Sequence, residues 1–310
     1  MTGEGARSAI GVFGSANMDI VVRVASLPKP GETVFGHTLT TNPGGKGLNQ
    51  AVAAARAGAQ VEFIGTLGRD PYGDELADLL QREKIRTSQL RRVGTTGTAH
   101  ITVEAGGENT IVVVSGANLA TASDQVTDGL LDSIGWLVSQ LELHVGSVTA
   151  AFRHARRRGV RTVLTPAPAR PLADDQLAEV DLLVPNQHEA CLLAGLDDPL
   201  AAAAALSRRC GDVVVTLGAE GAAWAHGGEV VATVPGRKVR AVDATAAGDT
   251  FVGALVAQLA EGAELEQAIR VAGVAASITV TRPGAADSMP RRSEIQAALS
   301  GAFGMAAPAG

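Results

Sequence analysis

A short run of small residues beside a single carboxylate is the part of this sequence best suited to chemistry. Ala246, Ala247 and Gly248 precede Asp249, and the apolar spacing after them predicts a helix. A turn of this kind directs backbone N–H groups at one point, at the positive end of the helix dipole. An anion-binding turn next to a possible base is what phosphoryl transfer to an alcohol needs. The alternative is an ordinary small-residue turn in which Asp249 caps the helix.

The composition limits the classes of protein to which the chain can belong. Its 310 residues suffice for one large α/β domain or for two domains, and 46% hydrophobic residues provide a full core. The net charge of −6 argues against a general nucleic-acid surface, and no apolar run predicts a membrane span. The 2 cysteines, without CxxC spacing or a signal peptide, lead us to expect a cytoplasmic protein without a disulfide framework.

Alternating strands and helices dominate the chain from about residue 120 onward. The predicted strands there are 134–138, 162–165, 181–184 and 212–216, and the last predicted helices are 250–260 and 265–277. Earlier in the chain the sequence predicts strands at 9–14 and 61–64 and helices at 48–57 and 73–83. This order predicts a mostly parallel sheet with helices on both faces.

Four extended segments in the N-terminal half are too polar on one face for that parallel sheet. They span residues 20–24, 33–40, 98–104 and 109–114. In the third segment Ala99, Ile101 and Val103 alternate with polar residues, which gives the segment one apolar face. We therefore expect a small separate sheet that forms a lid over the strand ends, with edges that invite pairing with a second copy.

Polar side chains follow several of the predicted strands directly. Asn17 and Asp19 follow the first strand, Glu142 follows the strand near residue 137, and Asn186 and Glu189 follow a later strand. A single residue of this kind usually serves a turn or a helix cap. Because ligands of open α/β sheets bind beyond the carboxyl ends of the strands, the repeated placement predicts a binding site there.

The glycine-rich run Gly44–Asn49 is a second candidate binding segment. Glycines let the backbone approach a ligand closely, and the Asn49 amide can donate and accept at once, which suits vicinal hydroxyl groups. The run is not a P-loop, and the first strand does not lead into GxGxxG, which disfavours a dinucleotide-dependent oxidoreductase. The alternative is a glycine-rich helix start without a ligand.

Taken together, these motifs resemble the ribokinase branch of the phosphofructokinase-B (ribokinase-like) family of carbohydrate kinases, over about residues 10–298. The matching segments are Gly14–Asp19, Pro30–Thr33, Gly44–Ala51, Gln140–Glu142, Pro166–Ala169, Pro185–Glu189, Thr216–Gly218, Val242–Asp249 and Thr281–Ala285. The resemblance implies a ribokinase-like three-layer α/β fold in a single domain, residues 1–310, with a mostly parallel central sheet and helices on both faces. It also implies a β-sheet lid formed by segments about 19–42 and 96–115.

The resemblance further implies ATP-dependent phosphorylation of the 5-hydroxyl of D-ribose, giving ribose 5-phosphate and ADP. Asp249 would act as the base, and Ala246, Ala247 and Gly248 would form the anion hole. The implied sugar-binding residues are Asn17, Asp19, Gly45, Lys46, Asn49, Ala99, Ile101, Glu142 and Asp249. The implied nucleotide-binding residues are Asn186, Glu189, Thr216, Gly218, Gly221, Gly248 and Gly273, of which Asn186 and Glu189 would organise Mg²⁺ largely through water. The implied K⁺ site consists of Asp243, Thr245, Thr279, Arg282, Gly284 and Ser288, several of them through backbone carbonyls.

Substrates, partners and location follow from the same resemblance, and some alternatives stay open. It implies ATP, Mg²⁺ and K⁺ as cofactors, a cytoplasmic location, and a homodimer formed through the β-sheet lid, without nucleic acid or membrane as partner. A fructokinase or a 2-keto-3-deoxygluconate kinase fits the motifs too, whereas 3% aromatic residues disfavour a nucleoside kinase. A non-catalytic sugar or nucleotide sensor is the alternative from another class.

Overall fold

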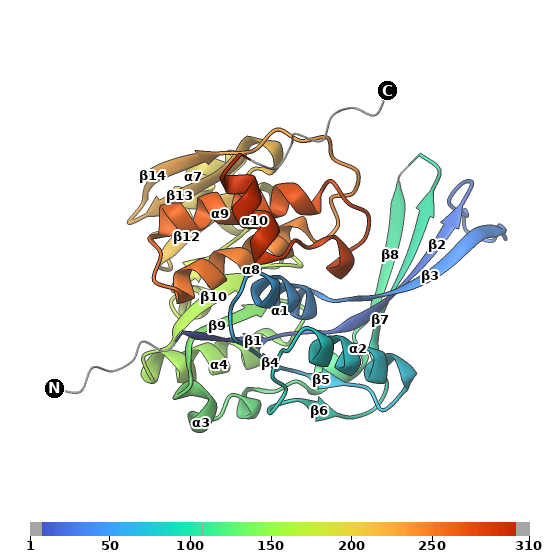
Figure 1. The fold of residues 1–310 in the computed structure, drawn as a ribbon, viewed down its shortest axis with the longest axis horizontal. Coiled ribbons are helices and arrows are strands. Elements are labelled where there is room, and N and C mark those ends of the chain that lie inside the picture. Colours follow the sequence, from blue (N-terminus) through green and yellow to red (C-terminus); the bar gives the residue numbers. More distant parts are fainter. Residues whose placement is uncertain (1–7, 107, 302–310) are drawn as a thin grey trace.

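Figure 1 shows the computed structural model of the protein, which describes residues 8–106 and 108–301. Within those residues an eight-stranded sheet has the order β14-β13-β12-β11-β10-β9-β1-β4. Its strands are β1 (Ala9–Phe13), β4 (Val61–Ile64), β9 (Ile134–Gln140), β10 (Arg161–Thr165), β11 (Leu182–Leu183), β12 (Asp212–Thr216), β13 (Gly221–His226) and β14 (Glu229–Pro235). The strands from β4 to β12 pair in parallel, and β13 and β14 add an antiparallel hairpin at one edge, which confirms the mostly parallel sheet.

Helices cover both faces of this sheet because alternate strand residues point to opposite sides. In β1, Ile10 and Val12 belong to one core cluster and Phe13 to the other. One face packs against α1 (Lys46–Arg56), α2 (Pro71–Arg82), α8 (Ala247–Ala260), α9 (Leu265–Thr279) and α10 (Arg292–Leu299). The other packs against α3 (Asp128–Leu131), α4 (Val145–Arg157), α5 (Asp174–Leu177), α6 (Gln187–Ala194) and α7 (Pro199–Leu206). The predicted three-layer arrangement is therefore confirmed (Figure 1).

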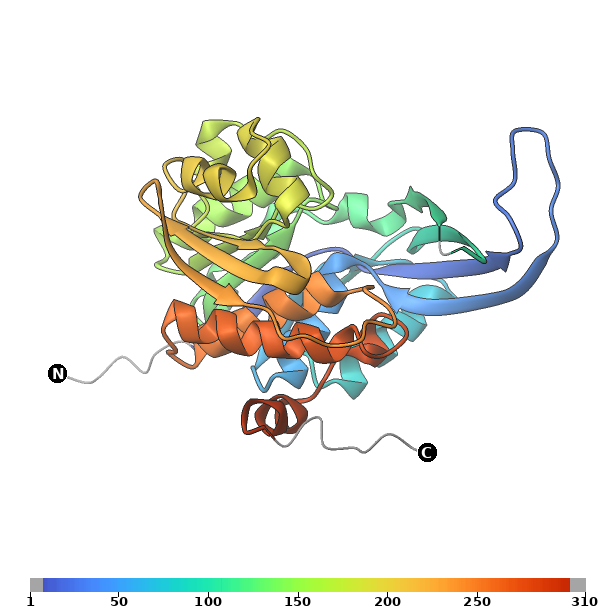
Figure 2. The same cartoon turned by 90° about the horizontal axis from the view of Figure 1, so that it is seen from above.

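The second sheet is the predicted lid. Its strands are β2 (Asn17–Val24), β3 (Gly36–Gly44), β7 (Gly97–Glu104) and β8 (Asn109–Val114), in the order β3-β2-β7-β8. Strands β2 and β7 pair in parallel and join the two extended pairs into one sheet. This sheet projects away from the helical layers, and the connection between β2 and β3 reaches furthest out (Figure 2). A two-stranded sheet, β5 (Thr66–Leu67) and β6 (Arg91–Arg92), completes the strands of the described residues.

Sequence reasoning did not place the hairpin of β13 and β14. Its turn contains Gly227 and Gly228, both with positive φ, of 59° and 95°. A Gly-Gly pair between extended segments is a standard hairpin signal, because tight hairpin turns need left-handed backbone conformations. The strand predicted at 181–184 is also shorter in the structure, where β11 contains Leu182 and Leu183 only.

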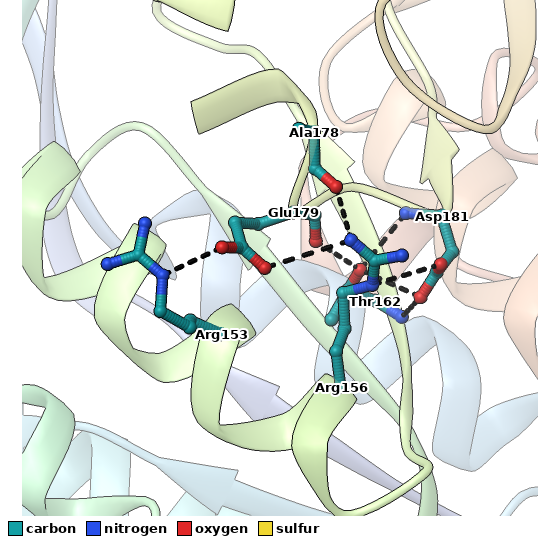
Figure 3. Close-up of polar contacts among 6 residues, drawn as sticks. All are labelled: Arg153, Arg156, Thr162, Ala178, Glu179 and Asp181. Atoms are coloured by element: carbon teal, nitrogen blue, oxygen red, sulfur yellow. Dashed lines mark hydrogen bonds and ion pairs between the residues drawn. The ribbon is translucent and has the colours of Figure 1, made fainter. Parts of the chain in front are cut away.

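A polar network lies at the end of the sheet where β10 begins (Figure 3). Because the predicted ligand site lies beyond the carboxyl ends of the parallel strands, this is the opposite end. The N–H and hydroxyl of the fully buried Thr162 donate to Asp181 Oδ2 over 2.8 and 3.1 Å. On α4, Arg156 Nε lies 3.3 Å from Asp181 Oδ1, and Arg153 Nε lies 2.7 Å from Glu179 Oε1. The network therefore ties α4, β10 and the segment before β11 together.

We predict that Asp181→Ala destabilises the protein by about 1–3 kcal/mol, because the buried N–H of Thr162 then lacks an acceptor, whereas the Thr162 hydroxyl keeps the Glu179 carbonyl at 2.7 Å. The free energy of unfolding in urea measures this loss. The matched control is Glu179→Ala, which removes ion pairs to the exposed Arg153 and Arg156 side chains and should change the stability by less than about 1 kcal/mol. Equal losses of unfolding free energy in the two variants would show that the buried contact between Thr162 and Asp181 stabilises the fold no more than the ion pairs of Glu179.

Candidate active site

The backbone around Asp249 has the conformation that an anion-binding turn requires. Ala246 precedes α8 and adopts a left-handed conformation with φ of 59°, which non-glycine residues seldom do. Helix α8 starts at Ala247, and the N–H groups in the first turn of a helix have no partner within that helix. A left-handed residue followed by the N–H groups of a helix start is the backbone arrangement that can bind an anion.

Two amide side chains from α1 hold the Asp249 carboxylate. Asn49 Nδ2 donates to Oδ2 and Gln50 Nε2 donates to Oδ1, each over 3.0 Å. Asp249 is only 7% exposed, and this burial raises its pKa, while Lys46 and the two amide donors act in the opposite direction. Sequence reasoning predicted Asn49 here and did not identify Gln50.

Four carboxylates, those of Asp19, Glu142, Glu189 and Asp249, and the Lys46 ammonium group interact electrostatically at this end of the sheet. Burial first, then Glu142 and Asp249, raises the pKa of Asp19 to about 7. Burial opposes the charge of Lys46, yet Asp249, Glu142 and Glu189 together raise the pKa of its ammonium group. Glu142 Oε2 accepts from the Lys46 N–H over 3.0 Å and from the Ser15 hydroxyl. The structure thus gathers charged residues that the sequence separates by more than 200 positions.

The remaining predicted sugar residues line the root of the lid. Asn17 and Asp19 lie on β2, and Ala99 lies opposite Asp19 in the β2–β7 register, with Ile101 opposite Val21. Gly45 caps α1 with φ of 88°, a left-handed conformation that favours glycine. A side chain at Gly44 would meet the Asp19 carboxylate at 2.2 Å, so the glycine run also makes room for that group.

Asn118 is a buried residue of this site that sequence reasoning missed. Its Nδ2 donates to Asn17 Oδ1 over 2.7 Å, and its Oδ1 accepts from the Ala16 N–H over 2.9 Å. It is 2% exposed and orients Asn17 from 101 positions away, a distance at which no sequence pattern signals contact.

The predicted nucleotide segment combines a helix cap with a glycine loop. Asn186 and Glu189 form a reciprocal capping box at α6, with bonds of 2.9 and 2.8 Å. Asn186 also pairs with Thr216, where the loop containing Gly218 and Gly221 begins. These glycines have φ of 61° and 107°, in the region that favours glycine. Burial raises the pKa of Glu189, whereas the Asn186 N–H and Lys46 lower it. The last predicted residue, Gly273, lies in α9, which packs against β13 and β14.

The predicted cation residues come from two loops that hydrogen bonds join. Asp243 accepts from the N–H groups of Thr245 and Gly284 over 2.9 and 3.0 Å, and these bonds outweigh its partial burial and lower its pKa. Thr279 closes α9 and its carbonyl accepts from the Arg282 N–H over 3.0 Å. The Arg282 side chain pairs with Glu294, and Ser288 is fully buried. These residues can therefore offer their backbone carbonyl oxygens as ligands for a cation. In the part of the chain described, no three His, Cys, Asp or Glu side chains cluster as metal ligands, which a carbonyl site does not require.

Comparison with known proteins assigns the chain to a family. The pfkB family carbohydrate kinase model matches residues 8–292. Ribokinase of Bacillus subtilis is 40% identical, with 93% of this chain and 98% of that protein covered. Among solved structures, Thermotoga maritima ribokinase has a TM-score of 0.87 at 33% identity, covering 94% of this chain and 99% of the other. Arabidopsis thaliana ribokinase, solved with ribose and ATP, has a TM-score of 0.86 at 31% identity, covering 94% and 98%.

The chain therefore belongs to the pfkB family of carbohydrate kinases. Its full-length similarity to ribokinases confirms the branch that the motifs indicated. None of the helices in the described residues combines the length and apolarity needed to span a bilayer.

The raised pKa of Asp19 predicts how the stability of the ligand-free protein depends on pH. A carboxyl group whose pKa rises on folding, from 3.8 to about 7, stabilises the fold at low pH, and this contribution disappears as the pH rises through about 7. We predict that Asp19→Asn raises the melting temperature more at pH 8 than at pH 5. Each kcal/mol gained in the free energy of unfolding corresponds to a rise of about 2–4 °C.

Asp70→Asn is the control for this prediction. Burial opposes the ionisation of Asp70, but hydrogen bonds from Thr96 and Gly73 hold its pKa below the ordinary value. The effect of Asp70→Asn should therefore be the same at pH 5 and pH 8, since Asp70 is ionised at both. An Asp19→Asn effect that is equally independent of pH would contradict the raised pKa.

Proposed function

We propose that this kinase transfers the γ-phosphoryl group of ATP to the 5-hydroxyl of D-ribose, giving ribose 5-phosphate and ADP. The observation that carries the proposal is the buried Asp249 carboxylate beside the left-handed turn at the start of α8. This arrangement supports a proton acceptor next to an anion-binding surface. The similarity to ribokinases, one of them solved with ribose and ATP, supports ribose as the acceptor.

Asp249 serves as the base in this proposal. Transfer through a loose, metaphosphate-like transition state lets the hydroxyl lose its proton late, so the carboxylate mainly aligns the attacking oxygen and accepts the proton at the end. Ala246, Ala247 and Gly248 form the anion hole, where backbone N–H groups and the helix dipole stabilise the transferring phosphoryl group. Lys46, whose ammonium group is held charged by three carboxylates, adds positive charge nearby.

The sugar is recognised by a ring of amides and carboxylates at the root of the lid. Carboxylates accept from hydroxyl groups, and amides can both accept and donate, which together suit a polyhydroxyl ligand. The residues of this set are Asn17, Asp19, Gly45, Lys46, Asn49, Glu142 and Asp249, with Ala99 and Ile101 of the lid beside them. Asn49 Oδ1 is buried and has no hydrogen-bond partner among the described residues, as expected of an acceptor kept for a ligand.

The nucleotide and the cations use the second half of the chain. Thr216, Gly218, Gly221, Gly248 and Gly273 contact ATP in this proposal. Asn186 and Glu189 would hold Mg²⁺ largely through water, and a bound ion would neutralise charge on the phosphates. K⁺ would be held by Asp243, Thr245, Thr279, Arg282, Gly284 and Ser288 and would order the loop before α8. The hydrogen bonds between the two cation loops support this assignment.

ADP release with a panel of acceptors tests the proposed reaction. We predict turnover with ribose, and much less with 2-deoxyribose, fructose, 2-keto-3-deoxygluconate or adenosine, at rates higher in K⁺ than in Na⁺ at equal ionic strength. The control is Asp249→Ala, which should lower kcat by about 10²–10⁴ while ATP still binds. Turnover with another acceptor in place of ribose would contradict ribose as the substrate, and equal rates in both salts would contradict the proposed K⁺ site. Sugar binding without ADP release would indicate a sensor.

We also propose a cytoplasmic homodimer that forms through the lid. Strand β8 is an edge of the lid, and its Ile111, Val112, Val113 and Val114 are each 51–63% exposed. An exposed apolar edge strand invites pairing, and a second copy would cover this surface. The two cysteines are not joined in a disulfide, which fits a reducing compartment.

We predict that Val112→Lys shifts the protein from dimer to monomer, because it places a charge on the apolar edge. Light scattering at working concentration measures the mass. The matched control is Val231→Lys on β14, a half-exposed valine at the edge of the large sheet, which should leave the mass unchanged. A wild-type protein that is already monomeric would refute the dimer.

A further inference from the structure

Gln50 is a buried residue of α1 whose side-chain amide is fully used in hydrogen bonds. Its Nε2 donates to Asp249 Oδ1 over 3.0 Å and to the Thr165 hydroxyl over 3.2 Å. Its Oε1 accepts from Gln140 Nε2 over 2.6 Å. Gln50 is 1% exposed and its neighbour Asn49 is 6% exposed, so both amides reach Asp249 from inside the protein.

The partners of Gln50 fix which way its amide points. Thr165 and Gln140 lie at the ends of the adjacent strands β10 and β9, and both are buried. If the Gln50 amide turned over, its oxygen would face the Asp249 carboxylate and its NH₂ would face the NH₂ of Gln140. Both contacts would be repulsive, so the NH₂ group is directed at Asp249.

Gln140 keeps this orientation at the expense of its own hydrogen bonding. Its Oε1 is buried and has no hydrogen-bond partner in the part of the chain that the structure describes. An unsatisfied buried acceptor costs about 1–3 kcal/mol, and proteins seldom retain one without a compensating role. The compensating role here is a chain of hydrogen bonds in one direction: Gln140 donates to Gln50, and Gln50 donates to the Asp249 carboxylate.

We propose that Gln50, oriented by Gln140 and Thr165, is the positioning residue of Asp249. This inference rests on the proposed function, in which Asp249 is the base. Gln50 and Asn49 each occupy one carboxylate oxygen, which fixes the rotation of the group and leaves the remaining lone pairs for the sugar hydroxyl. Gln50 also favours the ionised form of a carboxylate whose burial favours the protonated form.

Gln50→Met tests the proposal because it keeps the volume of the side chain and removes its hydrogen bonds. We expect kcat to fall by about 10-fold to 100-fold, by analogy with the range found when the partner that orients a metal ligand is lost, with the KM for sugar changed less than about 3-fold. The acid limb of the pH profile of kcat should move to higher pH, because the carboxylate loses a donor that stabilises its charge.

Gln140→Met is the second variant and keeps the proposal testable if Gln50→Met does not fold. It leaves Gln50 in place without its orienting donor, so the same changes should appear at smaller size. The matched control is Gln125→Met. Gln125 is 2% exposed, donates to the Gly65 and Gln89 carbonyls and accepts from the Ala122 N–H, away from Asp249. The Gln125→Met variant should lose stability, but the pH profile of its kcat should stay where it is in the wild type.

The outcomes separate this proposal from the proposed function. If Asp249→Ala retains normal turnover, the base assignment fails, and the positioning role fails with it. If Asp249→Ala abolishes turnover but Gln50→Met lowers only stability, as Gln125→Met does, Gln50 is structural and the positioning proposal alone is overturned. In support, Gln50→Met should add less than about 2-fold to the loss in an Asp249→Ala background, since both act through one group.

Discussion

The charge of a carboxylate buried at the start of α8 is the constraint on which the rest of the site depends. Removing Asp249 from water favours its neutral form, so several elements must supply compensating interactions at once. The α8 dipole, the Lys46 ammonium group and two amides of α1 provide them from different directions. They can do so only if α1 and α8 approach closely. A side chain at Gly253 of α8 would meet Ala53 of α1 at 2.5 Å, which shows how tight the approach is.

This approach explains the unusual composition of the core. Helix α1 presents Ala51, Ala53 and Ala54 as buried residues, and the chain contains only 3% aromatic residues. Small side chains let helix backbones come close, and they lose little conformational entropy on burial. Where α1 meets α8, the contact is thus built from small side chains, and the geometry around Asp249 depends on the spacing of these two helices.

Periodic patterns made the architecture predictable from the sequence, and long-range contacts limited what could be predicted of the site. The parallel strands, the lid and the helix after Asp249 follow from local alternation and helical spacing, and the structure confirms them. Gln50 and Asn118 carry no such signal, because their partners lie 199 and 101 positions away and a glutamine in a helix suggests a solvated face. Asn186 and Glu189 show the reverse case, since their spacing indicated a ligand motif and the structure shows that they also cap α6.

The continuity between β1 and the lid has a consequence for how preferences can diverge in such enzymes. Residues 14–16 lead directly from the large sheet into β2, so Asn17, Asp19 and Ala99 belong to the lid while Lys46, Glu142 and Asp249 belong to the body. The proposed acceptor pocket is therefore a composite of two structural parts, the lid and the body. Exchange of the lid strands would replace one wall of the pocket and leave the phosphoryl-transfer apparatus in its original frame.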